Sequence, residues 1–141
     1  MKTRTVSVSA LLFLSALYAP LAAAQANPWT KTQLAPTIYS AGTDNSNFFS
    51  PSGMLNSNTV NGVSWNIGLY SNGAASQDIK LCYKPPVGAE ICLDNIARPT
   101  GNTTSFNGLG VKGTFRITYR LTGGNYPVTP TFSNTLTVGW Q

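Results

Sequence analysis

The sequence predicts an all-β protein, a single-domain β-sandwich of about seven antiparallel strands with one disulfide hairpin. Apolar residues alternate with polar ones in short runs, which is the pattern of half-buried strands. Glycine, proline and asparagine separate these runs, as expected for turns. Cys82 and Cys92 lie in two neighbouring runs. A sandwich and a small barrel both fit this spacing, and the sandwich is the architecture that we expect.

The start of the chain is predicted to be a secretory signal peptide, residues 1–26, followed by the domain at 27–141. A short basic start precedes the apolar run Val6–Ala19, and small residues then allow cleavage after Ala24 or Ala26. An uncleaved anchor helix is the alternative. No other long apolar run exists, so we expect no membrane span after cleavage, and the signal peptide predicts export from the cytosol.

The stretch Ile79–Asp94 predicts a β-hairpin closed by a disulfide between Cys82 and Cys92. If these cysteines face each other across an antiparallel ladder, the register of the hairpin follows. It places two opposite-charge pairs beside the bridge: Lys80 with Asp94, and Lys84 with Glu90. The other face is then apolar: Ile79, Leu81, Tyr83, Ile91 and Leu93. An oxidising compartment favours the disulfide, and two free buried cysteines are the alternative.

The remaining strands are predicted from alternation and from the turn residues between them. They are Trp29–Leu34, a short piece at Thr37–Tyr39, Val63–Leu69, a weak strand at Thr103–Phe106, Thr114–Leu121 and Thr135–Trp140. Prolines beside the first of them indicate an edge strand. Trp65 is expected in the core, and Leu136, Val138 and Trp140 are expected to face inward.

The segment Gly42–Asn61 is the most loop-like part of the chain, because it is rich in Asn, Ser, Pro and Gly. It contains four large apolar side chains: Phe48, Phe49, Met54 and Leu55. We expect these side chains to pack over the rim of a sheet. An exposed patch that binds a partner is the alternative.

The composition argues against an enzyme. The chain has no histidine, which excludes the usual Ser/His and Cys/His pairs and histidine metal sites. Asp44 and Asp78 lie in unrelated segments, and Asp44-Asn45 is a weak calcium candidate. After signal cleavage seven basic and four acidic residues remain, a net charge of +3 that is dispersed. We therefore expect no cofactor, no metal and no nucleic-acid partner.

Three surfaces are candidates for binding another molecule. The first is the row of Arg116 and Arg120, which can lie beside the face of Lys80 and Lys84, with an ordinary solvated sheet face as the alternative. The second is a set of aromatic residues that could stack on sugars or grip an apolar segment, unless they pack in the core or rim: Trp29, Tyr39, Tyr70 and Tyr126. The third is an exposed strand edge near Trp29–Tyr39 or at the C-terminus.

From Trp29 to Trp140 the order of features resembles the flagellar FlhE family of small periplasmic proteins. The matching positions are Trp29, Trp65, Leu81-Cys82, Cys92-Leu93-Asp94, Phe106 with Gly108, Ile117 with Tyr119, Gly123-Gly124, Pro130, and Asn134 with Leu136 and Val138. The end of the chain, Trp140-Gln141, departs from the aromatic-basic pair of the family. A relative serving another secretion system is therefore the alternative.

The resemblance implies a non-enzymatic, chaperone-like accessory of the bacterial flagellum in the periplasm. Such a protein would act at flagellar export, limit leakage through the export channel, or prevent premature assembly of flagellar parts. The implied partner is a flagellar or export-apparatus protein. Cys82 and Cys92 match as the structural bridge, and Trp29 and Trp65 match as aromatic positions. No contacts to the partner are assigned to particular residues.

Two hypotheses from other classes stand beside this one. A secreted carbohydrate-binding or adhesin-like β-sandwich would explain the polar composition dotted with aromatic residues. An inhibitor of a periplasmic enzyme, such as a wall hydrolase, would fit the small size, the bridge and the basic character.

Overall fold

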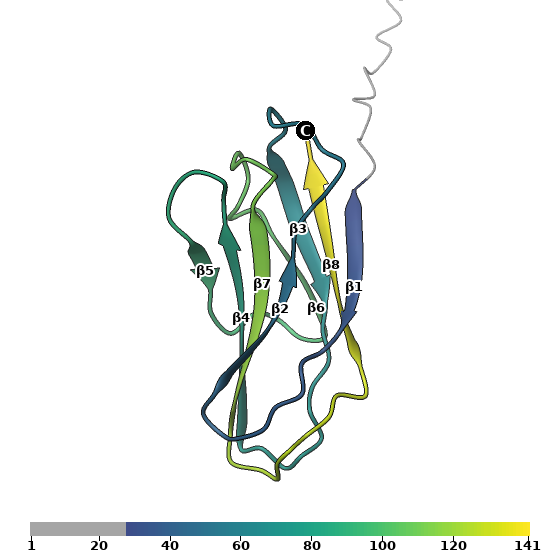
Figure 1. Ribbon diagram of the computed structural model, residues 1–141, viewed down its shortest axis with the longest axis vertical. Helices are drawn as coiled ribbons and strands as arrows, with labels where there is room; N and C mark the ends of the chain where they lie inside the picture. Colours follow the sequence, from purple (N-terminus) through teal and green to yellow (C-terminus); the bar gives the residue numbers. More distant parts are fainter. Residues whose placement is uncertain (1–27) are drawn as a thin grey trace, which may run out of the picture.

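The computed structural model of the protein describes residues 28–141, which form two four-stranded antiparallel sheets packed face to face (Figure 1). The strands are β1 (Trp29–Leu34), β2 (Asp44–Phe49), β3 (Val60–Asn66), β4 (Ser76–Lys84), β5 (Ile91–Leu93), β6 (Thr100–Thr103), β7 (Thr114–Thr122) and β8 (Ser133–Trp140). The predicted all-β sandwich with a disulfide hairpin is confirmed, with eight strands where about seven were expected. The predicted signal peptide lies outside the described residues.

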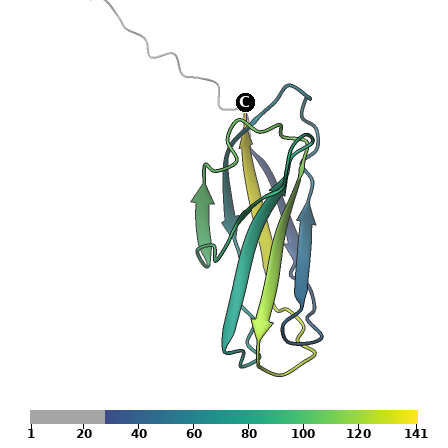
Figure 2. The same ribbon diagram turned by 90° about the vertical axis from the view of Figure 1, so that its left-hand side faces the viewer.

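The two sheets have the strand orders β1-β8-β3-β6 and β2-β7-β4-β5. Figure 2 shows the layers, with teal β4 and light-green β7 in front of yellow β8. In the first sheet the last strand of the chain is inserted between β1 and β3. The C-terminal strand is therefore central, and the predicted option of an exposed edge at the C-terminus is wrong. The prediction of an edge strand at Trp29–Leu34 is confirmed.

The core lies between the sheets and is built from the alternate residues of each strand. Strand β7 contributes four fully buried side chains: Phe115, Ile117, Tyr119 and Leu121. Trp65 of β3 is buried as expected, and its indole Nε1–H donates to the carbonyl oxygen of Ala97 at 2.8 Å. Leu136 and Val138 of β8 face inward, whereas Trp140 is half-buried against the rim of the core.

The segment predicted as a loop, Gly42–Asn61, contains the edge strand β2, so that prediction is wrong. The sequence of β2, Asp-Asn-Ser-Asn-Phe-Phe, has low strand propensity, and pairing with β7 outweighs it. The four apolar side chains of the segment divide between two environments. Phe49 and Met54 are buried in the core, whereas Phe48 is 58 % exposed and Leu55 is also exposed.

Two strand boundaries also differ from the prediction. Strand β3 ends at Asn66, and Leu69 beyond it is exposed. Strand β6 ends at Thr103, so the weak strand expected at Thr103–Phe106 lies earlier. Phe106 is fully buried from the loop that follows β6, where it packs edge-on against Phe115. This core residue is therefore carried by a loop and not by the strand predicted there.

The hairpin register is confirmed: Leu81 pairs with Leu93, Cys82 with Cys92 and Tyr83 with Ile91. The disulfide joins Cys82 to Cys92, and the Lys80 ammonium lies 2.9 Å from the Asp94 carboxylate as predicted. The predicted pair of Lys84 with Glu90 is wrong. Strand β5 starts at Ile91, so Glu90 lies in the tip beyond the ladder and bonds to Arg116 at 2.9 Å. Lys84 donates instead to the carbonyl oxygen of Gly88 at 2.6 Å.

Candidate partner-binding surfaces

The charged side chains divide unequally between the two sheets. All four acidic side chains of residues 28–141 lie on or beside the β2-β7-β4-β5 sheet: Asp44, Asp78, Glu90 and Asp94. The four strands of the other sheet contain a single charged residue, Lys31 in β1. The two sheets therefore differ in charge, and the β1-β8-β3-β6 sheet is almost neutral.

The two predicted arginines lie on the outward face of β7, where Arg116 is opposite Cys82 and Thr118 is opposite Lys80. Arg120 donates through Nε to the Asp44 carboxylate at 2.7 Å. That hydrogen bond, together with the charges of Asp44 and Asp78, raises the pKa of Arg120 above its usual value. Arg116 is bonded to Glu90 at 2.9 Å. The two arginines are thus matched by carboxylates and do not form an uncompensated basic row.

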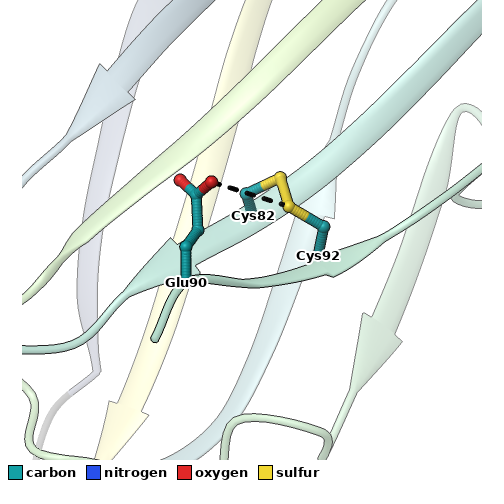
Figure 3. Close-up of side chains that lie close together, drawn as sticks. All are labelled: Cys82, Glu90 and Cys92. Atoms are coloured by element: carbon teal, nitrogen blue, oxygen red, sulfur yellow. Dashed lines mark hydrogen bonds between the residues drawn. A yellow bond between two sulfur atoms is a disulfide. The ribbon is translucent and has the colours of Figure 1, made fainter. Parts of the chain in front are cut away.

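The disulfide is part of a compact side-chain group on the same face (Figure 3). The ligand atoms of Cys82, Glu90 and Cys92 all lie within 4.8 Å of one another. Both sulfurs are joined in the bridge, so the group offers no thiolate to a metal ion. The Glu90 carboxylate lies 3.9 Å from the Cys92 sulfur and is bonded to Arg116. The group therefore connects the hairpin to β7, and we do not assign it a metal.

The four predicted aromatic residues have different environments. Tyr70 is buried and packs edge-on against Tyr119 and Phe132, so its surface is not available to a ligand. Trp29 is half-buried against the core, and Tyr126 is half-buried with its hydroxyl donating to Gly123 at 2.6 Å. Tyr39 is 74 % exposed. The core alternative therefore holds for Tyr70, whereas a role of Trp29 or Tyr39 in binding stays a prediction.

The buried tyrosines predict alkaline unfolding. Burial raises the pKa of Tyr70, Tyr83 and Tyr119 above the usual value of about 10, so the folded state keeps protons that the unfolded state loses. Their contribution to the free energy of unfolding is complete below about pH 10 and is lost as pH rises further. We expect tyrosinate absorbance from these three residues to appear together with loss of native circular dichroism.

The control for this titration is Tyr39→Phe, which removes the phenolic hydroxyl of an exposed tyrosine and should leave the pH midpoint of unfolding unchanged. Full ionisation of all tyrosines while the native circular dichroism persists would contradict the prediction.

A shallow pocket of about 300 Å³ lies at one end of the neutral sheet face. It is lined by Pro28, Asn61, Gly62, Val63, Ser64, Asn102, Thr103, Thr104, Thr137 and Gly139. Ser64 lies between Thr137 and Asn102 in the sheet, so their side chains share the outward face. The β-bulge between Val60 and Val63 shapes the pocket rim. Sequence reasoning did not identify this pocket, because its residues come from three strands that are distant in the sequence.

The edges of β1 and β2 lie next to each other along one side of the sandwich. Gln33 of β1 donates through Nε2 to the carbonyl oxygen of Phe48 at 2.7 Å, and Asn47 of β2 donates through Nδ2 to that of Leu34 at 3.0 Å. These two bonds connect the two sheets at one end of β1. The predicted edge surface near Trp29–Tyr39 is thus present, and side-chain hydrogen bonds cover its end at Gln33 and Leu34.

These features define a class of protein: a small disulfide-linked β-sandwich with an open strand edge and a neutral sheet face. No family model matches the chain, and no curated protein matches it. A crystal structure of FLHE is similar to it, with a TM-score of 0.65 and 19 % sequence identity over 82 % of this chain and 96 % of that chain. At this identity the likeness establishes the fold, so the chain has an FlhE-like fold, as the resemblance implied. Within residues 28–141 no helix has the length and apolar character needed to cross a membrane.

Proposed function

We propose that this protein is a flagellum-associated accessory of the periplasm that acts by binding a flagellar or export-apparatus protein. The observation that carries the proposal is the FlhE-like fold, which extends over 82 % of the chain. The disulfide is consistent with an oxidising compartment, and the predicted signal peptide supplies the route to it. Under this proposal the protein acts at flagellar export or prevents premature assembly of flagellar parts in the periplasm.

The test is deletion of the gene in its flagellated host, with swarming and the location of filament subunits as readouts. We expect altered swarming or misplaced subunits, restored by the full chain. A chain that lacks residues 2–26 is the control, because it cannot be exported and should not restore the phenotype. A deletion strain with normal flagella and normal swarming would overturn the proposal.

The neutral pocket favours a second candidate, binding of a neutral sugar chain. Among the described residues, hydroxyl and amide groups line it without any charged side chain: Asn61, Ser64, Asn102, Thr104 and Thr137. Groups of this kind can hydrogen-bond a saccharide that carries no charge. A glycan array with the wild type and with Asn102→Ala tests this candidate. Hits that disappear in the variant support it, and an array without hits removes it. Inhibition of a periplasmic enzyme stays a prediction that no particular feature favours.

A further inference from the structure

Among residues 28–141, strand β1 forms one edge of the β1-β8-β3-β6 sheet, with β8 on one side and no strand on the other (Figure 1). Most residues of β1 are exposed, and Pro28 and Pro36 lie just outside its two ends. An edge of this kind presents backbone groups that an additional strand can bind.

Two hydrogen bonds determine which backbone groups of β1 face this edge. Ala35 N–H donates to the carbonyl oxygen of Phe132 at 3.2 Å, in the same register as β1 and β8, so odd-numbered residues bond to β8. The Leu34 carbonyl accepts a bond from Asn47, which confirms that even-numbered residues point away. Thr30 and Thr32 therefore direct their N–H and C=O groups outward at the open end of the edge.

The edge is preorganised. The Thr30 hydroxyl lies 3.0 Å from that of Thr137, and the Thr32 hydroxyl lies 2.8 Å from that of Thr135. The bond from Gln33 to Phe48 fixes the other end of the strand. Little conformational entropy of β1 is therefore lost when a ligand strand adds to it.

Charge selects the kind of segment that fits. Lys31 is the single charged residue in the four strands of this sheet, which contain no carboxylate. Lys31 lies on the same side of β1 as half-buried Trp29. An added strand would place a side chain beside each of them, so a carboxylate beside Lys31 and an apolar group beside Trp29 are favoured. Antiparallel pairing of two copies of β1 in the register that joins Thr30 to Thr32 would instead bring two lysines together.

We propose that the β1 edge binds an extended, acidic segment of another protein by strand addition. The proposal rests on the proposed function, in which this segment belongs to the flagellar or export-apparatus partner. It deepens that function by naming the mode of binding, through backbone bonds of Thr30 and Thr32, and the chemistry of the partner.

The test uses a fluorescein-labelled peptide of about nine residues in which valine and glutamate alternate, with fluorescence anisotropy as the readout. Thr32→Pro removes an outward N–H while leaving the bonds to β8, so we expect binding to weaken by about tenfold or more. Thr32→Ala keeps the N–H and should bind as the wild type does. The matched control is Asn102→Pro, which makes the same change at the β6 edge.

Asn102 is a suitable control because its backbone groups also face outward. Ile67 N–H donates to the Pro99 carbonyl in the register of β3 and β6, so Asn102 is not bonded to β3. Circular dichroism and thermal unfolding establish that each proline variant is folded. Should Thr32→Pro fail to fold, Lys31→Glu supplies the test. This variant should bind a peptide of alternating valine and lysine more tightly than the valine–glutamate peptide that the wild type prefers.

Three results would overturn the proposal: equal binding by the wild type and folded Thr32→Pro, an equal loss in Asn102→Pro, or no binding of the acidic peptide. A dimer of the wild type that Thr32→Pro abolishes would also overturn it, because a second copy would then occupy the edge. If Thr32→Pro fully restored normal swarming to the deletion strain, strand addition at β1 would be excluded, whereas the proposed flagellar function would be retained.

Discussion

Replacing Phe115 by alanine is expected to lower the free energy of unfolding by about 3–5 kcal/mol. Phe115 is fully buried and stacks on Tyr83, with the ring centroids 4.0 Å apart. Phe106 packs edge-on against both rings, at 5.7 and 5.8 Å. The three rings connect β7, β4 and the loop after β6, so truncation leaves a cavity that neighbours on three segments border. Chemical denaturation measures the loss.

The matched control is Phe48→Ala. Phe48 lies on β2, one residue from the partner of Phe115, but its ring is largely exposed on the outer face. We expect its truncation to change the free energy of unfolding by no more than about 0.5 kcal/mol. A loss below about 1 kcal/mol for Phe115→Ala, or equal losses for the two variants, would contradict the packing of Phe115 against Tyr83 and Phe106.

Removing the disulfide in the double variant Cys82→Ala/Cys92→Ala is expected to cost about 2–3 kcal/mol. The bridge closes a short loop, with a sequence separation of 10, and this limits the entropy that it removes from the unfolded chain. Strand β5 has three residues, and among the strands that the structure describes it pairs with β4 alone. Hydrogen exchange at Ile91–Leu93 should therefore rise more than elsewhere in the β2-β7-β4-β5 sheet.

The comparison variant is Asp94→Asn, which breaks the exposed ion pair with Lys80 in the same hairpin. Both side chains are largely in solvent, so the expected loss is below about 1 kcal/mol. If this variant and the double cysteine variant lose the same free energy, the bridge is not the main element that holds β5.

The charged face of the β2-β7-β4-β5 sheet shows which ion pairs the sequence of one hairpin can predict. The hairpin register followed from two cysteines and alternation, and the pair of Lys80 with Asp94 confirms it. The pair of Lys84 with Glu90 failed because a strand from elsewhere in the chain, β7, brings Arg116 to the same carboxylate. Arg120 and Asp44 are likewise joined across β7 and β2. Pairing within a hairpin is local, whereas the competition for a carboxylate depends on the whole sheet.

The missed strand has a similar cause. Asp44–Phe49 carries four polar residues in a row, and its strand conformation depends on β7, to which the Ser46 and Thr118 hydroxyls add a contact of 2.8 Å. The neutral pocket and the open β1 edge could not be predicted in detail either. Both depend on β8 lying between β1 and β3, which joins the two ends of the domain.

By itself the sequence determined the fold class, the disulfide with its register, and the inward faces of β4, β7 and β8, because alternation and turn residues act over a few neighbouring positions. The tertiary structure decided the division into two sheets, the central place of β8 and the pairing of the arginines. It also placed a single charged residue, Lys31, in the four strands of the β1-β8-β3-β6 sheet. Those features arise from contacts between distant segments, whose relative free energies no short stretch of sequence encodes.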